Sequence, residues 1–288
     1  MRGAASGLDV DVLQWPALSV LGVRRLQGGG VLVRRLTDDT GVEVAVPDVV
    51  ERVVSIVPSL TETVAVTAPG LVVGATDWCT HPADLDVVRV KGTKNPDVGR
   101  IAMLRPDLVL ANVEENRAPD LDALRAAGLP VWVTDVRTVD GAFASLTRLL
   151  DACGLREPAW LRAAEAAWAD VEPLSPRRRA VVPIWRRPWM AVGSDTFTGA
   201  VLGRLGVDNV LAGSPDRYPR IALGELPPTD LVVLPDEPYR FTADDGPEAF
   251  PGVPAALVSG RHLTWYGPSL IEAPTALKAQ LTAPLVPF

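Results

Sequence analysis

The sequence contains little cysteine and little histidine. Its 288 residues include two cysteines, Cys79 and Cys153, and two histidines, His81 and His262. Two cysteines are far too few for a disulfide framework. Cys153 follows a predicted helix, where a buried free thiol is expected. Cys79 and His81, with His262 far away, do not have the spacing of a structural zinc site. We therefore predict no metal held by the protein alone, although His81 could ligate a metal that a bound chelate brings with it.

The sequence also lacks an excess of positive charge and the short motifs of common enzyme classes. The formal net charge is −7 with a pI near 5.0, and the arginines are scattered except in Arg177-Arg178-Arg179, so no basic face for nucleic acid is predicted. The Gly-x-Ser-x-Gly elbow, the phosphate-binding loop and the glycine set of dinucleotide-binding folds are missing. Glu114 and His81 could form an acid–base pair, but nothing in the sequence fixes their geometry. We predict no catalytic residue.

The N-terminal stretch lacks the pattern of a cleaved leader. Asp9 and Asp11 precede a short apolar run that Pro16 interrupts, whereas a secretory signal combines a basic start with a longer apolar run. We interpret residues 1–30 as an extension of unknown role and expect the chain to stay in the cytoplasm, without membrane insertion. The alternative is an extracytoplasmic protein whose true start differs from the given one.

One clear helix pattern stands between two runs of alternating strand and helix patterns. Pro158 suits a first helical turn, Trp160 and Trp168 recur at helical spacing, and Pro173 ends the pattern, which predicts a helix over Glu157–Glu172. About 15 residues at about 1.5 Å each span about 22 Å, which is enough to connect two lobes and too short to cross a membrane.

Strand patterns alternate with helix patterns on both sides of this helix. This order predicts an α/β fold with two Rossmann-like lobes, each with a central, mostly parallel sheet covered by helices. The predicted boundaries are 31–155 for the first lobe, 156–178 for the interlobe helix and 179–288 for the second lobe.

Several local elements follow from the same patterns. Residues 31–47 predict a β-hairpin, Val53–Val57 a buried strand, Val139–Ala152 a helix and Ser269–Leu281 a closing helix. Ser59 with Glu62 three positions later predicts a capping box that opens a helix after the buried strand.

A faint repeat links the two predicted lobes. Asp107-Leu-Val-Leu and Asp230-Leu-Val-Val each lead to an acid seven positions after the aspartate, Glu114 and Glu237. Chance is an equally good explanation. If the repeat is real, it predicts two lobes with matching loops.

Aromatic and charged side chains gather in loops after the predicted strands, where ligand sites of parallel sheets lie. Aromatic walls suit a flat or bulky ligand, and a few charges can orient its polar groups. Each residue could instead be an ordinary loop residue. The predicted ligand-binding residues are Ser59, Trp78, His81, Lys94, Glu114, Arg137, Trp185, Arg186, Trp189, Tyr239, Arg240, Trp265 and Tyr266.

Seven ordered segments carry a family resemblance. They are Arg52–Val64, Val72–Pro82, Gly92–Arg117, Gly128–Asp135, Pro183–Phe197, Asp208–Val210 and Leu263–Pro268. Together, over about residues 31–288, they resemble the cobalamin- and siderophore-binding receptors of bacterial ABC importers, the helical-backbone (class III) periplasmic-binding family. The resemblance implies two α/β lobes joined by one long helix, little hinge closure, and a corrin, haem or iron chelate held in the cleft between the lobes.

The resemblance also defines the expected function. It implies binding of a tetrapyrrole-like or metal-chelate ligand of cobalamin, haem or siderophore type, with the chelate as ligand and not as a resident cofactor. Importer receptors of this type offer one acid from each lobe to the permease, whereas Gly99 and Gly224 stand at these positions here. We therefore expect a binding protein that does not dock on an ABC permease. The alternatives are an exported importer receptor and an enzyme acting on a metal or corrinoid in the same cleft.

Overall fold

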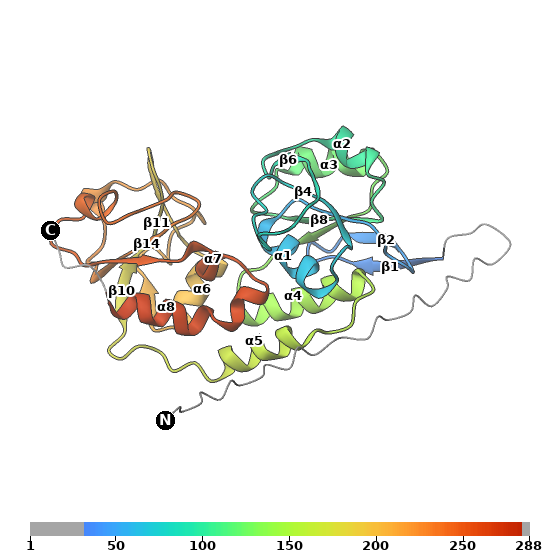
Figure 1. The fold of residues 1–288 in the computed structure, drawn as a ribbon. Coiled ribbons are helices and arrows are strands. Elements are labelled where there is room, and N and C mark those ends of the chain that lie inside the picture. Colours follow the sequence, from blue (N-terminus) through green and yellow to red (C-terminus); the bar gives the residue numbers. More distant parts are fainter. Residues whose placement is uncertain (1–31, 284–288) are drawn as a thin grey trace, which may run out of the picture. The chain divides into compact units, whose positions relative to one another are not determined.

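The computed structural model describes residues 32–283, which contain two parallel sheets (Figure 1). The predicted extension, residues 1–30, lies outside the described residues. The unit that contains both sheets begins at Leu32. We call residues 32–152 the first half and residues 178–283 the second half. The predicted α/β architecture with mostly parallel sheets is confirmed, whereas the lobe boundaries stay a prediction.

The first half is built on a five-stranded sheet in which every strand pair is parallel. In order across the sheet, its strands are β5 Val88–Arg89, β4 Val72–Ala75, β3 Val53–Ser55, β8 Leu108–Asn112 and β9 Val131–Thr134. The helices are α1 Pro58–Thr67, α2 Val98–Met103, α3 Ala118–Ala126 and α4 Val139–Ala152. Every residue of β3, β8 and β9 is buried, as expected for parallel strands with both faces covered.

Two short antiparallel hairpins accompany this sheet: β1 Val33–Thr37 with β2 Glu43–Pro47, and β6 Lys91–Gly92 with β7 Asn95–Pro96. The first confirms the hairpin predicted around Asp38–Gly41, apart from Val31, which lies outside the described residues. Its turn is held by Asp38, whose carboxylate accepts from the backbone N–H groups of Thr40 and Val42.

The second half is built on a four-stranded parallel sheet. In order across the sheet, its strands are β13 Val207–Asn209, β10 Arg178–Val181, β14 Leu231–Pro235 and β15 Ala255–Val258. The other elements are the antiparallel pair β11 Pro183–Arg186 and β12 Trp189–Ala191, the helices α6 Phe197–Arg204, α7 Gly260–Thr264 and α8 Ala273–Thr282, and the 3₁₀ turns η1 Leu223–Glu225, η2 Pro247–Ala249 and η3 Pro268–Ile271.

The connecting helix α5, Ala159–Ala169, is shorter than the helix predicted over Glu157–Glu172. Its apolar face buries Leu161, Ala164 and Trp168, and the Trp168 indole N–H donates to the Leu270 carbonyl at 3.0 Å. The helix stops at Ala169, four residues before Pro173, since a proline has no N–H to donate to the carbonyl four residues earlier and its ring clashes with that carbonyl. The helix exists where it was predicted, but both predicted ends were wrong.

Two other local predictions were also wrong, and three short elements were missed. The capping box is not formed, because α1 begins at Pro58 and places Ser59 inside the helix. Glu62 is instead buried and forms an ion pair with Arg261 of α7. The closing helix is split into η3 and α8 at Glu272, and β13, β15 and α7 were missed because three to five residues are too few for a periodic pattern.

The repeat predicted from the sequence corresponds to equivalent local structure. The Asp107 N–H donates to the Arg52 carbonyl at 2.8 Å, and its carboxylate accepts from the Arg52 N–H at 2.9 Å. Asp230 makes the same two bonds with Arg179, at 2.8 and 3.0 Å. Each aspartate therefore fixes the start of an interior strand, β8 or β14, against the neighbouring strand. The two sheets therefore share the same hydrogen-bonding arrangement at the start of β8 and of β14.

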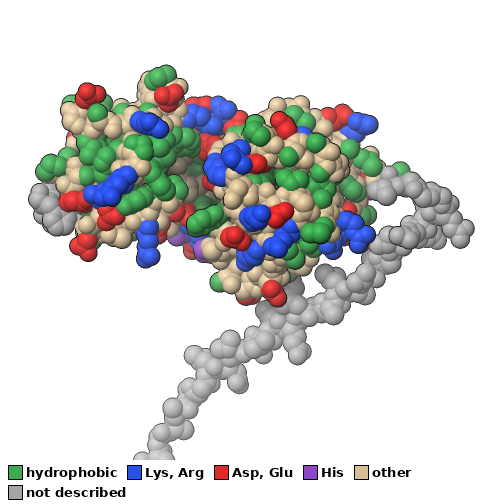
Figure 2. Space-filling model, turned by 90° about the horizontal axis from the view of Figure 1, so that it is seen from above, with side chains coloured by type: hydrophobic (Ala, Val, Ile, Leu, Met, Phe, Trp, Pro, Cys, Tyr) green, Lys and Arg blue, Asp and Glu red, His purple; other side chains and the backbone are tan. Residues whose placement is uncertain are grey.

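Charge is mixed on the face seen in Figure 2, where basic and acidic side chains intermingle. Within residues 32–283, no helix combines the length and apolar character needed to cross a bilayer.

Candidate ligand site

The candidate site lies where β8 and β14 end. The buried Asn112 closes β8 and organises the next turn, because its Oδ1 accepts from the backbone N–H groups of Glu114 at 2.7 Å and Glu115 at 3.1 Å. Asp236 follows β14, and its carboxylate accepts from the Gly260 N–H at 2.6 Å at the start of α7. Acidic side chains therefore follow equivalent strands of both sheets.

Polar contacts join the two halves at this place. The Glu114 carboxylate forms an ion pair with Arg217 and accepts from the Tyr218 hydroxyl at 2.8 Å. The Tyr266 hydroxyl accepts from Asn112 Nδ2 at 2.5 Å and lies 3.0 Å from the Thr134 hydroxyl. The loop after β8 and the carboxyl ends of β8 and β9 are thus tied to two segments of the second half.

An aromatic contact lies beside these polar ones. The ring of His81, from the loop after β4, meets the Trp265 indole edge-on at a centroid distance of 5.3 Å. The Arg261 guanidinium lies 5.9 Å from the Trp265 ring and is paired with Glu62 of α1 and with Glu272. Trp265 is only 8% exposed, so it packs between the halves and does not project into solvent.

A second aromatic cluster belongs to the second half alone. Arg186 pairs with Asp245 and Glu248 and lies 5.4 Å from the Trp189 ring. Trp185 meets Tyr239 edge-on at 5.6 Å and is 43% exposed. These contacts hold the β11–β12 hairpin and present the Trp185 ring to solvent.

The structure brings together some of the predicted site residues and separates others. Those in contacts between the halves are His81, Glu114, Arg137, Trp265 and Tyr266, where Arg137 pairs with Asp195. Lys94 lies beside them within the first half and donates to the Glu114 carbonyl. Those in the cluster of the second half are Trp185, Arg186, Trp189 and Tyr239.

The three remaining predicted residues lie apart from both groups. Ser59 is buried in α1, Trp78 is 67% exposed next to the β6–β7 hairpin at Gly92, and Arg240 is exposed after β14. The ligand-binding role of all thirteen residues stays a prediction.

Sequence reasoning missed four residues of this place: Asn112, Arg217, Tyr218 and Glu237. Glu237 could have been predicted, because the repeat makes it the counterpart of Glu114. Asn112 ends β8, the strand that follows Asp107, but its turn-forming role has no pattern of its own. Arg217 and Tyr218 lie in a long irregular loop, where nothing in the sequence points to Glu114.

The local environment disfavours negative charge on two of the acids. Burial raises the pKa of Glu237 to about 7, with smaller contributions from the nearby carboxylates Asp236 and Glu115. Burial also raises the pKa of Glu115, against the opposing charge of Lys94. The Tyr218 hydroxyl has a raised pKa because it is buried beside Glu114.

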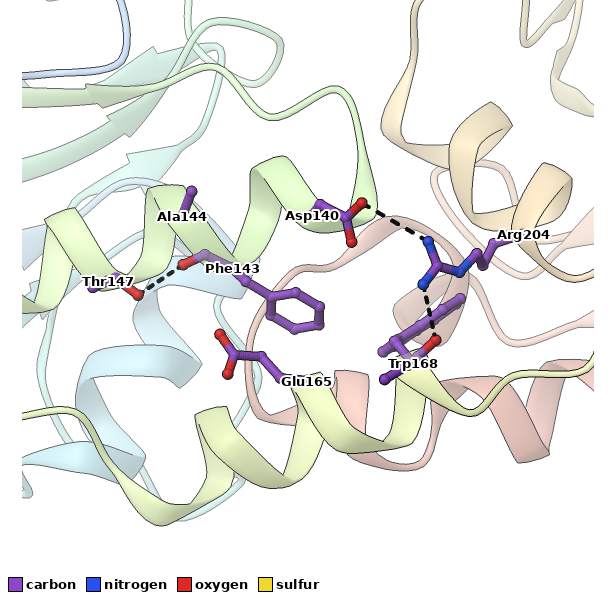
Figure 3. A pocket seen from close by; sticks show the side chains of 8 residues that line it. Asp140, Phe143, Ala144, Thr147, Glu165, Trp168 and Arg204 are labelled. Atoms are coloured by element: carbon purple, nitrogen blue, oxygen red, sulfur yellow. Dashed lines mark hydrogen bonds and ion pairs between the residues drawn. The ribbon is translucent and has the colours of Figure 1, made fainter.

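A recess of about 430 Å³ lies elsewhere, between α4, α5 and α6 (Figure 3). The Phe143 ring and the Glu165 carboxylate point into it. Arg204 is held by Asp140 at 3.8 Å and by the Trp168 carbonyl at 3.2 Å. None of the predicted site residues lines this recess. Among residues 32–283 there is also no group of three or more His, Cys, Asp or Glu side chains placed to hold a metal ion.

Comparison with known proteins identifies the fold. No protein-family model matches the chain. The vitamin B12-binding protein of Pectobacterium carotovorum is 24% identical over 252 residues, covering 81% of this chain and 89% of that protein. The periplasmic vitamin B12-binding protein BtuF of Vibrio cholerae matches with a TM-score of 0.59 at 18% identity, covering 81% of this chain and 97% of that chain. The resemblance to the helical-backbone receptors is confirmed.

A haem receptor shares the same fold. The periplasmic haem-binding protein HutB of Vibrio cholerae matches with a TM-score of 0.63 at 18% identity, covering 81% of this chain and 99% of that chain. The relatives are named for binding and not for catalysis, which confirms the prediction of a binding protein over an enzyme.

The same comparison corrects the expected location. We expected the chain to stay in the cytoplasm, and this is wrong, because the matching receptors are periplasmic binding proteins. The expectation rested on Asp9, Asp11 and Pro16, which lie outside the described residues.

Proposed function

We propose that the chain is an extracytoplasmic binding protein for a tetrapyrrole-like or metal-chelate ligand of cobalamin, haem or siderophore type. The observation that carries the proposal is that the end of β8 and the loop after it meet Arg217, Tyr218 and Tyr266 of the second half, in a fold shared with receptors for vitamin B12 and haem. Carboxyl ends of parallel strands are where such sheets place their ligands.

The exposed aromatics suit this role. Trp78 and Trp185 project from loops or hairpins of different halves and are 67% and 43% exposed, so a flat ligand can cover them without disturbing a core. His81 is positioned at the contact between the halves, where it can reach a metal that the ligand already holds. In this proposal the chelate brings the metal, and the chain provides aromatic surfaces and hydrogen-bonding groups that contact the chelate.

The ligand proposal predicts that Trp185→Ala weakens binding about tenfold or more while leaving the fold intact. Covering a large aromatic ring on a ligand contributes on the order of 1 to 3 kcal/mol, and 1.4 kcal/mol corresponds to a tenfold change in affinity. The measurement is an absorbance titration of the purified chain with cyanocobalamin and, separately, with haemin. Met103→Ala is a matched control, because Met103 is 76% exposed on α2, before the opposite end of β8. Failure of the unmodified chain to bind either ligand, or equal losses in the two variants, contradicts the proposal.

We also propose that the chain does not use the two-acid docking of importer receptors. Gly99 lies in α2 and Gly224 in η1, the helical segments that precede the equivalent strands β8 and β14, which supports the alignment of both positions. Neighbouring Asp97 is already engaged, because its carboxylate caps α2 through the Arg100 N–H at 3.0 Å and pairs with Lys91 at 3.1 Å. Rim charges of this kind set encounter rate and orientation in complexes.

The double substitution Gly99→Glu/Gly224→Glu tests the docking proposal. Both positions have room, since of the described atoms an added Cβ meets only Asp97 Oδ1 at 3.6 Å at Gly99 and none within 4 Å at Gly224. We expect the unmodified chain to leave the ATPase rate of a reconstituted vitamin B12 importer unchanged and the double variant to bind that importer at least about tenfold more tightly. Stimulation by the unmodified chain equal to that of a cognate receptor contradicts this.

A further inference from the structure

Two neighbouring side chains of the second half meet on a single carboxylate of the first half. The Arg217 guanidinium forms an ion pair with one carboxylate oxygen of Glu114, and the Tyr218 hydroxyl donates to the other at 2.8 Å. A guanidinium and a hydroxyl that converge in this way suit the charge and the two oxygens of a carboxylate. Arg217 and Tyr218 are therefore placed to recognise a carboxylate, whichever molecule carries it.

The second half holds the loop of these two residues in place. The Gly193 N–H donates to the Arg217 carbonyl at 2.7 Å, and Arg217 Nε donates to the Asp195 carbonyl at 3.0 Å. The loop also lies close against Gly193, since a Cβ added there would come within 2.1 Å of the Asp216 carbonyl oxygen. Groups that are already fixed in position lose little conformational freedom when they bind a ligand.

The ion pair between Arg217 and Glu114 is shielded from solvent but is not well aligned. Arg217 Nη2 and Glu114 Oε1 are both buried, and their contact does not have the geometry of a hydrogen bond. A buried guanidinium requires a partner of opposite charge, because a buried charge left alone is costly. Glu114 supplies that charge without an aligned hydrogen bond between these two atoms, so a carboxylate with better geometry can replace it.

Glu114 reaches Arg217 and Tyr218 with its side chain alone. Its backbone is fixed after β8, where its N–H donates to Asn112 Oδ1 at 2.7 Å and its carbonyl accepts from the Lys94 ammonium group. Rotation about the side-chain bonds is therefore enough to turn the carboxylate away while the loop keeps its shape. Lys94 lies beside the same residue, so a displaced carboxylate has a cation near it.

We propose that Arg217 and Tyr218 form a carboxylate-binding site that the chain fills with its own Glu114, and that a carboxylate of a bound chelate takes the place of Glu114. The chain then selects chelates that carry carboxylates, such as haem with its propionate groups, over cyanocobalamin, which carries none. This selection rests on the proposed function, whereas the carboxylate site does not. In this role Glu114 competes with the ligand, and an internal competitor lowers the apparent affinity for it.

A free carboxylate tests the site without any chelate. We expect sodium propionate to bind Glu114→Ala at least about tenfold more tightly than the unmodified chain, because the internal competitor is gone. The measurement follows the side-chain NMR signals of Arg217 and Tyr218 as propionate is added. Propionamide, which has a similar shape and no charge, should give no saturable shift. The matched control is Glu157→Ala, which removes an acid paired with the exposed Arg162 and should bind propionate no better than the unmodified chain.

Two further variants complete the propionate experiment. If Glu114→Ala does not fold, Glu114→Gln takes its place, since it removes the charge and keeps an acceptor for the Tyr218 hydroxyl. Adding Arg217→Gln to the Glu114 variant should abolish the shift of the Tyr218 signal. The carboxylate site is overturned if the Glu114 variant shows no saturable shift, if Glu157→Ala shows an equal one, or if binding survives Arg217→Gln.

Haemin and its dimethyl ester test the selection. In an absorbance titration, Glu114→Ala should bind haemin at least about fivefold more tightly than the unmodified chain does, and the ester, whose carboxylates are capped, equally in both chains. A loss of haemin affinity in Glu114→Ala, or an equal gain for the ester, overturns the selection. Binding of cyanocobalamin but not haemin overturns it as well and leaves the proposed function standing. Binding of neither removes both, and the propionate titration still decides the carboxylate site.

Discussion

Replacing Arg261 by alanine should destabilise the chain by about 3 kcal/mol, because it leaves a buried glutamate without its partner. Glu62 has a side chain only 6% exposed, and Arg261 pairs with it from α7. Arg261 also pairs with Glu272 at 3.1 Å and lies over the Trp265 ring. The measurement is urea-induced unfolding followed by tryptophan fluorescence.

The control for Arg261 is an arginine whose partner is exposed. Arg162 pairs with Glu157 at 2.9 Å, with side chains 61% and 47% exposed. Arg162→Ala should cost less than about 1 kcal/mol. A double variant, Glu62→Gln/Arg261→Met, should recover part of the loss, because it removes the buried charge together with its partner. A loss in Arg261→Ala no larger than in Arg162→Ala contradicts the structural role of the pair.

Replacing Trp168 by alanine should cost about 3 to 5 kcal/mol, the range for deleting a fully buried large aromatic ring. Trp168 is 1% exposed on α5, and its indole N–H donates to the Leu270 carbonyl at 3.0 Å. Its removal would leave a cavity and an unsatisfied carbonyl where the connecting helix meets η3. Thermal unfolding followed by circular dichroism measures the loss.

Trp160 provides the comparison on the same helix. It is only partly buried, and its indole N–H donates to the Thr67 hydroxyl at 2.9 Å. Trp160→Ala should therefore destabilise the chain distinctly less than Trp168→Ala, while Trp168→Phe should fall between them because it keeps a ring and loses the hydrogen bond. Equal losses for the two alanine variants would mean that α5 is not anchored through Trp168.

The elements that the sequence predicted well are those in which burial imposes a long pattern. The helix predicted over Val139–Ala152 has the same ends as α4, because Thr138 caps its start and apolar residues repeat along one face. The strand predicted over Val53–Val57 contains β3, Val53–Ser55, and was recognised because both faces of its sheet are covered, which favours a run of apolar residues. The repeat of Asp107 and Asp230 could also be recognised in the sequence. Each aspartate fixes the start of a strand through hydrogen bonds, and apolar strand residues follow it.

The candidate site was harder to predict because its contacts join distant positions. Tyr266 meets Asn112 over 154 positions, and Tyr218 meets Glu114 over 104. No local pattern encodes such a pair, so the sequence indicated which loops follow strands but not which side chains meet. Ser59 and Glu62 are a different case, in which a local pattern was present but the predicted local structure did not form. Their spacing matches a capping box, but α1 begins at Pro58 and the buried Glu62 pairs with Arg261 instead.

The segment from Arg261 to Leu270 has a consequence for the order of events during synthesis. It contacts Glu62, His81, Asn112 and Trp168, all in residues that leave the ribosome long before it does. The nascent first half must therefore wait, with the loop after β8 and one face of α1 uncovered, until nearly the whole chain has been translated. A ribosome stalled before residue 261 should hold a first half that proteases and chaperones can still reach, and release of the last residues should close it.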